Sequence, residues 1–315
     1  MQVNSLKLDD KERDVKSLSY YSWIPEKSIA RVHILHGMSE HAKRYNDLAI
    51  SLNNAGYMVT ADDHRGHGHT GLAAKSSNHL ADHDGWRLLL EDQVTLLNNI
   101  YPRNDLPLFI LGHSMGAMMS LALCQKHASE IACPIKGTIL SGSWYSSSRI
   151  YKIAAAIANF ERLRLGSRLP SKLLHYLSFG GFNRSFRPCR TEADWLSRDT
   201  CMVDRYIQDP FCGQSLSTQS WVDFLLGVSE VFTKDSLNSL DRNLPIYLMS
   251  GDKDAVGGSG KKVFELRNRL LESGIHNVET TLYPGARHEI FNETNREEVY
   301  KDLITWLDRL MTKCI

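Results

Sequence analysis

The sequence predicts an α/β fold with a mostly parallel central sheet, helices on both faces and a helical cap inserted into it. Short, continuous apolar runs alternate with amphipathic helical patterns, as is typical of parallel strands buried on both faces. One such run, residues 108–111, ends abruptly at a glycine-flanked serine. The alternation is interrupted once, by about a hundred residues without a parallel-strand pattern, which is too long for a structureless loop in a compact domain.

The expected elements follow from these patterns in chain order. Strands are expected at residues 30–35, 57–62, 108–111, 135–141, 244–250 and 278–283. Helices are expected at 42–55, at 86–101, from Met115 onward and at 296–311, and the first twenty residues are expected to form an antiparallel edge hairpin. The predicted core is therefore residues 1–143 and 236–315, and the predicted cap is residues 144–235.

The serine lies in the motif Gly112-His113-Ser114-Met115-Gly116, between a buried strand and a helix. In this setting the two glycines are expected to permit a sharp, strained turn that exposes the hydroxyl of Ser114. The helix that follows directs its positive N-terminal end at the site, where negative charge develops during acyl transfer. This context predicts that Ser114 is a nucleophile.

A nucleophilic serine needs a base and an acid that orients the base, and with this turn both follow the serine in the chain. Of the later histidines (His127, His175, His276 and His288), His288 lies in a loop after the last predicted strand, from which it can reach Ser114. The preceding strand ends in Gly251-Asp252-Lys253-Asp254. We take Asp254 as the acid and Asp252 as a structural turn residue.

Acyl transfer also needs two backbone N–H donors that bind the oxyanion of the tetrahedral intermediate. One donor is expected from Met115, the residue after the nucleophile. The other is expected from the loop His36-Gly37-Met38-Ser39-Glu40-His41, which follows a strand and contains a His-Gly pair. We therefore expect the N–H of Met38 to be the second donor.

Five stretches resemble the monoglyceride lipase and lysophospholipase (serine aminopeptidase-like) branch of the α/β-hydrolases, in particular its bacterial members. They are HGMSEHAKRY (36–45), DDHRGHG (62–68), GHSMGA (112–117), SGDKD (250–254) and YPGARHEIFNE (283–293). The resemblance implies an α/β-hydrolase fold and a carboxylic ester hydrolase acting on monoacylglycerols or lysophospholipids. It implies the same site: Ser114, Asp254 and His288 as catalytic residues, with Met38 and Met115 in the oxyanion hole.

The predicted cap has an uneven charge distribution. Residues 142–190 carry nine Lys or Arg residues and one acid, interleaved with apolar residues, whereas residues 191–235 carry eight acids and three bases. A basic amphipathic helix is typical of contact with an anionic lipid surface. The alternative is an ordinary lid whose two halves pair their charges. In both cases we expect an apolar underside over Ser114 that suits an acyl chain.

Other features narrow the class of protein. A net charge of +1 gives no indication of nucleic-acid binding. The polar N-terminal segment, the lack of a membrane-length apolar run and six cysteines without C-x-x-C spacing (Cys124, Cys133, Cys189, Cys201, Cys212 and Cys314) predict a cytoplasmic protein. No cofactor is expected, because residues 66–71 fit a dinucleotide motif but lack its strand–helix context. No metal is expected either, because Asn292 stands where the motif H-E-x-x-H has its second histidine.

We therefore predict a serine hydrolase that cleaves esters of long-chain acyl lipids through an acyl-enzyme. Two alternatives remain at this stage. One is another activity of the same fold, namely that of a short-chain carboxylesterase, a peptidase or an acyltransferase. The other is a non-catalytic protein that holds a lipid in the same pocket.

Overall fold

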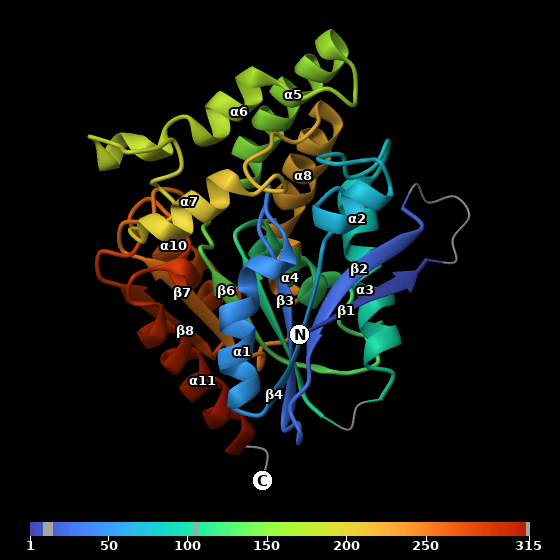
Figure 1. Cartoon of the computed structure of the whole chain (residues 1–315), viewed down its shortest axis with the longest axis vertical. Coiled ribbons are helices and arrows are strands. Elements are labelled where there is room, and N and C mark those ends of the chain that lie inside the picture. Colours follow the sequence, from blue (N-terminus) through green and yellow to red (C-terminus); the bar gives the residue numbers. More distant parts are fainter. Residues whose placement is uncertain (9–14, 104–105, 313–315) are drawn as a thin grey trace.

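Eight strands form one sheet in the order β1-β2-β4-β3-β5-β6-β7-β8. They are seen in a computed structural model that describes residues 1–8, 15–103 and 106–312 (Figure 1). The strands are β1 (Gln2–Lys7), β2 (Ser17–Trp23), β3 (Ala30–Leu35), β4 (Tyr57–Asp62), β5 (Leu108–His113), β6 (Ile135–Ser141), β7 (Ile246–Gly251) and β8 (Val278–Tyr283). The six strands from β3 to β8 run parallel, and β1 and β2 are antiparallel at one edge. The predicted fold class and the edge hairpin are confirmed.

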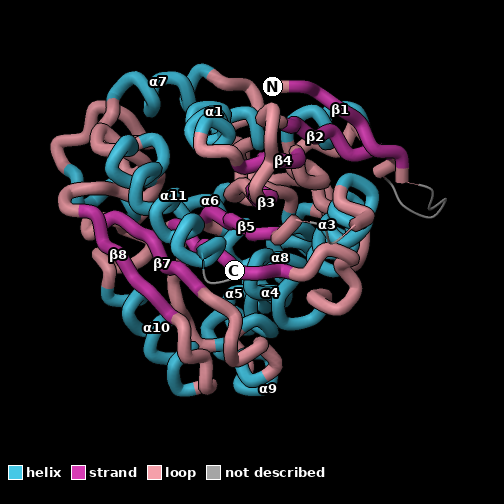
Figure 2. The backbone as a smooth tube through the Cα atoms, turned by 90° about the horizontal axis from the view of Figure 1, so that it is seen from below, coloured by secondary structure: helices cyan, strands magenta, loops and turns pink. Residues whose placement is uncertain are grey.

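Two groups of helices cover the two faces of the sheet (Figure 2). Side chains of α1 and α11 form the core with one face, and side chains of α3, α4, α9 and α10 form the core with the other. The helices of the core are α1 (Asn46–Asn54), α2 (Gly68–Ala73), α3 (Gly85–Ile100), α4 (Met115–Lys126), α9 (Lys234–Asn238), α10 (Lys261–Glu272) and α11 (Arg296–Thr312).

The register of the central strands determines which loops meet. β3 and β5 are neighbours, and Leu35 is paired with Gly112, so both strands end at the same level. On the other side of β5, His113 is paired with Ser141 of β6. Loops that follow parallel strands meet at the carboxyl edge of the sheet. The loop after β3 therefore lies beside Ser114.

The helix predicted at 42–55 is divided in two. Residues Ala42–Tyr45 form a 3-10 helix (η1), and the α-helix α1 begins at Asn46. The N–H of Ala42 donates to the carboxylate of Asp63 (3.0 Å), and Arg44 and Tyr45 both bind the side chain of Glu40. A tighter first turn is a common start for an α-helix, and here it directs three polar contacts into the core.

The segment proposed as the cap is helical and lies above the carboxyl edge of the sheet, with α5 and α6 at the top of Figure 1. Its elements are α5 (Ser148–Leu165), α6 (Lys172–Phe179), η2 (Phe182–Phe186), α7 (Thr200–Gln208) and α8 (Thr218–Val231). Helix α8 packs against α5 and also against α3 and α4 of the core. Residues 144–235 remain our proposed cap.

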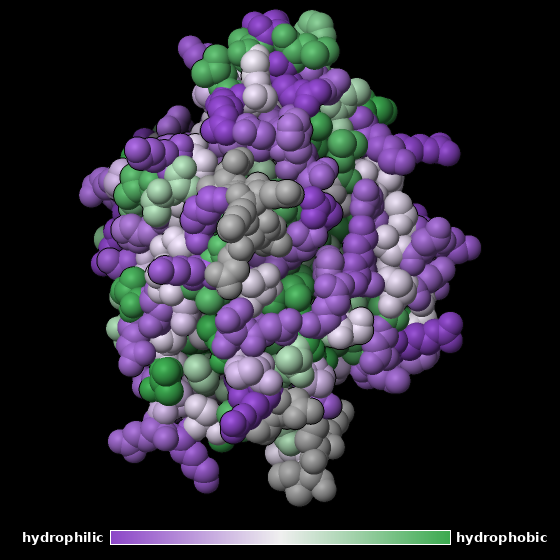
Figure 3. Space-filling model, turned by 90° about the vertical axis from the view of Figure 1, so that its right-hand side faces the viewer, coloured by the Kyte–Doolittle hydropathy of each residue, from purple (hydrophilic) through white to green (hydrophobic). Residues whose placement is uncertain are grey.

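The expected apolar underside over Ser114 includes Tyr151 and Phe179 of the basic half, but most of the apolar residues of α5 and α6 do not contribute to it. Helix α5 packs on α8 through Tyr151, Ala155 and Ala158, which are small or flat enough for a close approach. Leu174 of α6 is buried, but most of the larger apolar side chains on α5, α6 and the turn between them are exposed: Ile150, Ile153, Ile157, Phe160, Leu163, Leu169, Leu173 and Leu177. Figure 3 shows hydrophobic side chains interspersed with hydrophilic ones at this end of the molecule.

Candidate active site

Ser114 lies at the junction of β5 and α4, where its own backbone is strained. Its φ of 53° and ψ of −113° lie outside the regions that non-glycine residues favour. Gly112 and Gly116 do not adopt a positive φ, so their role differs from the one expected. A Cβ on Gly112 would lie 2.1 Å from the carbonyl oxygen of Gly116, and a Cβ on Gly116 would lie 2.0 Å from that of Leu35. The glycines permit close packing around a strained serine.

The loop after β3 brings a second backbone N–H donor toward Ser114. Gly37 packs directly against Ser114, because a Cβ on Gly37 would lie 3.4 Å from the Cβ of Ser114. The next residue is Met38, and Met115 begins α4 on the other side of Ser114. Within the described part of the chain, the N–H groups of Met38 and Met115 donate no hydrogen bond. Both amides are therefore available to bind an oxyanion.

The loops after β7 and β8 bring the predicted acid and base together. His288 Nδ1 lies 3.0 Å from Asp254 Oδ2, and both side chains are buried. The other oxygen of Asp254 accepts the N–H of Val256 at 2.8 Å. Asp252 instead accepts the N–H of Gly285 at 2.7 Å, as expected of a turn residue. Of the two aspartates, Asp254 is the one that contacts the histidine.

The electrostatics of this pair suit a base that is held in one orientation. Burial alone would raise the pKa of Asp254, but the imidazole of His288 holds that pKa below its usual value. Burial alone would lower the pKa of His288, but the charge of Asp254 outweighs burial and raises that pKa. Because the carboxylate is ionised and bonded to Nδ1, the proton is on Nδ1 and Nε2 is left to accept a proton.

The other candidate histidines are not placed as bases. His127 follows α4 and bonds the exposed Glu130 (2.9 Å). His276 follows the end of α10 and is exposed. His175 lies on α6, which the sequence pattern did not predict, and contributes to the cavity at Ser114, where its Nδ1 bonds Ser215 (2.8 Å).

A buried ion-pair network beside the site was not predicted from the sequence. Arg44 binds Glu40 at 2.5 Å and Glu289, the neighbour of His288, at 2.7 and 2.6 Å. Glu40 also accepts the N–H of Gly37 (2.6 Å) and the hydroxyl of Tyr45 (2.8 Å). The network joins the loop of Met38 to the loop of His288. In the sequence, the only indication of this network was one acidic residue in each of the two loops, Glu40 beside Met38 and Glu289 beside His288.

Buried histidines support the same loop from below. The rings of His36 and His64 stack at 3.8 Å, and the N–H of His64 donates to Nε2 of His36 (3.0 Å). His36 Nδ1 bonds the carbonyl of Gly37 (2.7 Å). Asp63 and Arg65 hold the adjoining turn through Ala42 and Asp92. This packing fixes the backbone next to Met38.

Ser114 and His288 line two cavities of different character. One, of about 420 Å³, is lined by polar groups such as Glu40, His175 and Asn183 together with apolar ones such as Phe179, Trp195 and Ile207. The other, of about 200 Å³, is mainly aromatic and aliphatic, with Trp144, Tyr151, Phe179, Trp221, Phe224 and Leu225 among its lining residues. Ser114 therefore lies between a space of mixed polarity and a smaller, more apolar one.

Comparison with protein families identifies the chain. The family model described as serine aminopeptidase, S33, matches residues 26–295. The chain belongs to the serine aminopeptidase S33 family. It is similar to the monoacylglycerol lipase of Mycolicibacterium smegmatis, with 28% identity over 91% of each chain. It is also similar to the monoglyceride lipase of Rattus norvegicus, with 26% identity over 88% of this chain and 82% of that one. The predicted family and the predicted enzyme class, a hydrolase, are confirmed.

The fold of this S33 hydrolase is similar to that of a thermostable carboxyl esterase from Bacillus coagulans, solved in complex with glycerol. The TM-score is 0.87 with 26% identity, and the match covers 98% of both chains. Among the described residues of the present chain, no helix combines the length and hydrophobicity needed to span a membrane.

Proposed function

We propose that the chain hydrolyses carboxylic esters that carry one long acyl chain and a polar head group, as in monoacylglycerols and lysophospholipids. The observation that carries this proposal is the position of Ser114 and His288 between a mainly apolar cavity and a larger one that also offers polar groups. An ester bound across the serine would place its acyl chain among Trp221, Phe224 and Leu225. Its head group would then lie in the larger cavity, within reach of polar side chains such as His175 and Asn183. The lipase and esterase relatives support the same assignment.

The proposed reaction passes through an acyl-enzyme. His288 Nε2 accepts the hydroxyl proton of Ser114 while Oγ attacks the ester carbonyl carbon, and Asp254 stabilises the resulting imidazolium. The N–H groups of Met38 and Met115 bind the oxyanion, and each such donor is worth roughly 10²–10³ in rate. Collapse of the intermediate expels the alcohol, which takes the proton from His288. Water, activated by the same histidine, then releases the fatty acid.

Chain-length preference tests the role assigned to the apolar cavity. We expect rates on p-nitrophenyl esters to rise with acyl length, and activity to persist on 1-monoacylglycerol and lysophosphatidylcholine. Leu225→Trp fills the apolar cavity and should lower the rate on long esters while sparing the acetyl ester. Leu226→Trp, at the exposed neighbouring position, is the matched control. Activity confined to short esters in the unmodified chain would indicate a small-molecule esterase instead.

We also propose that the substrate is taken from a membrane surface touched by α5. Ile153, Phe160 and Leu163 on this helix are 64%, 63% and 75% exposed. Arg149 and Lys152 on the same helix form no ion pair within the described residues. An exposed apolar stripe bordered by free cations is typical of a helix lying in the interface of an anionic membrane.

Vesicle binding tests the membrane contact. The double variant Ile153→Ser and Phe160→Ser should bind anionic phosphatidylglycerol vesicles at least tenfold more weakly, because each side chain gives about 1.5–3 kcal/mol when fully buried. Ile50→Ser, an exposed position on α1, should leave binding unchanged. Equal binding by all three proteins would contradict the proposal.

A further inference from the structure

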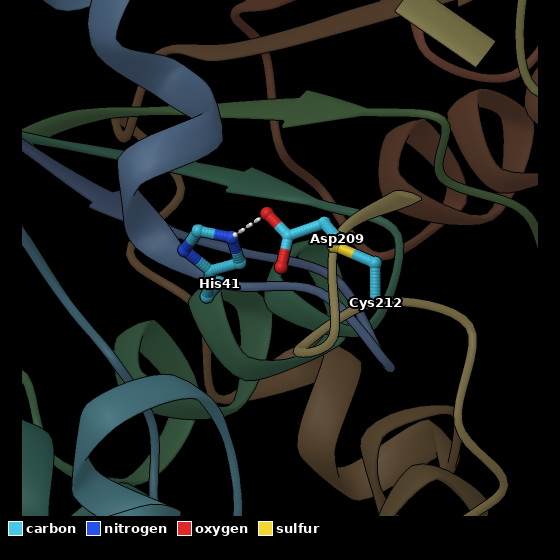
Figure 4. Close-up of side chains that lie close together, drawn as sticks. All are labelled: His41, Asp209 and Cys212. Carbon is cyan, nitrogen blue, oxygen red and sulfur yellow. Dashed lines mark hydrogen bonds and ion pairs between the residues drawn. The ribbon is translucent and has the colours of Figure 1, made fainter. Parts of the chain in front are cut away.

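Three side chains that the proposed reaction does not use cluster between the loop of Met38 and the cap. His41 comes from the end of that loop, and Asp209 and Cys212 come from the segment that follows α7 (Figure 4). The His41 Nε2 and Asp209 Oδ2 atoms are 2.9 Å apart. Together with the sulfur of Cys212, the three possible ligand atoms lie within 4.8 Å of one another.

We propose that His41, Asp209 and Cys212 bind Zn²⁺ and that the ion ties the cap to the oxyanion loop. An imidazole nitrogen, a carboxylate oxygen and a thiolate sulfur are the ligands that Zn²⁺ prefers, at about 2.0–2.3 Å. Two atoms bound to one such ion are at most about 4.6 Å apart. Small side-chain rotations therefore suffice to bring all three atoms onto one ion.

The hydrogen bonds of His41 and Asp209 leave one atom of each side chain able to bind the ion. Among the described residues, Nδ1 of His41 has no hydrogen-bond partner, although the residue is only 5% exposed. The bond to Asp209 places a proton on Nε2 when no metal is bound. Because no described group binds Nδ1, that nitrogen can carry the proton instead, and Nε2 can present its lone pair to a metal in place of the hydrogen bond to Asp209. Asp209 is held by the N–H of Phe211 through Oδ1 (2.9 Å), which leaves Oδ2 as the ligand.

Cys212 supplies the third ligand, and the cavity that it lines gives the ion access to the site. Its thiol is free and almost fully buried, and the residue lines the larger cavity at Ser114. Metal binding displaces the thiol proton to solvent. Because the cavity reaches Cys212, water can complete a four-coordinate site with three protein ligands.

The backbone already holds the two halves of the site together. The N–H of Gly213 donates to the carbonyl of Ser39 (2.9 Å), and the hydroxyl of Ser39 donates to the carbonyl of Gln214 (2.6 Å). These bonds place Cys212 next to the loop that carries Met38 and His41. The sequence motifs did not indicate this site because His41 and Asp209 are 168 positions apart.

The test uses Co²⁺ as a spectroscopic probe and Zn²⁺ in calorimetry, with the full chain. We expect one ion per chain and a near-ultraviolet thiolate-to-cobalt charge-transfer band. Cys212→Ser should abolish the band, and Asp209→Asn should weaken Zn²⁺ binding at least tenfold. Cys201→Ser, at an exposed cysteine on α7, is the matched control and should change neither signal.

Zn²⁺ should also raise the unfolding temperature of the unmodified chain and of Cys201→Ser, but not that of Cys212→Ser. Cys212→Ala replaces the serine variant if that variant does not fold, as judged by circular dichroism. Absence of the charge-transfer band, or its survival in Cys212→Ser or Cys212→Ala, would overturn the proposal. These readouts measure binding, so their outcome is independent of the proposed ester hydrolysis.

Discussion

Replacement of Asp254 by Asn tests the assigned acid against its neighbour two residues away. The Asp254 carboxylate is fully buried and accepts the Nδ1 proton of His288 over 3.0 Å. An asparagine of the same shape can turn its amide N–H toward Nδ1, which moves the histidine proton to Nε2. His288 then cannot accept the proton of Ser114. The expected loss in kcat is about 10⁴-fold, or about 5 kcal/mol of transition-state stabilisation.

The assay is kcat against pH with a p-nitrophenyl ester, for Asp254→Asn and for Asp252→Asn. Because Asp254 raises the pKa of His288, the acid limb of the residual activity should move to lower pH in Asp254→Asn. Asp252→Asn keeps an oxygen that can accept the N–H of Gly285 and should remain within a few-fold of the unmodified chain. Equal losses in the two variants, or a larger loss in Asp252→Asn, would refute the assignment of the acid.

Three further predictions concern stability, measured by urea unfolding. Arg44→Met leaves the carboxylates of Glu40 and Glu289 buried without a partner and should cost about 3–5 kcal/mol. Gly116→Ala should prevent stable folding because of the 2.0 Å approach to Leu35, whereas Gly181→Ala, which has open space, should not. Burial lowers the pKa of His67 from 6.5 to about 4, so the unfolded chain takes up a proton at a higher pH than the folded chain. Between pH 6.5 and pH 4 stability should therefore fall by about 3 kcal/mol from this residue, and His67→Gln should flatten that fall.

The strands were predictable because burial on both faces leaves a direct trace in the sequence. The predicted bounds at 30–35, 57–62, 135–141 and 278–283 match the observed strands, although β8 lies at the edge of the sheet and its middle residues are not buried. β7 begins at Ile246, after Pro245, because proline has no N–H to give to the sheet. The strained turn at Ser114 could be predicted for a different reason: its motif occupies five consecutive residues, so it is a local pattern.

Features that depend on distant partners could not be predicted. The apolar stripe of α5 was recognisable, but periodicity does not reveal which face of a helix is buried. Tyr151, Ala155 and Ala158 face α8, and the larger side chains remain outside. The contact between Arg44 and Glu289 spans 245 positions, and no local pattern encodes it. Cys314, one of the six cysteines noted in the sequence, lies outside the described residues.

Covalent labelling of Ser114 tests the central claim most directly. A fluorophosphonate probe should phosphonylate Ser114 Oγ with loss of fluoride, and mass spectrometry of the digested protein should place the adduct on the peptide that contains Gly112 to Gly116. Ser114→Ala should take up no probe, lose ester hydrolysis and keep its unfolding transition. An adduct on another residue, or appreciable turnover by a folded Ser114→Ala variant, would contradict the assignment of Ser114 as the nucleophile.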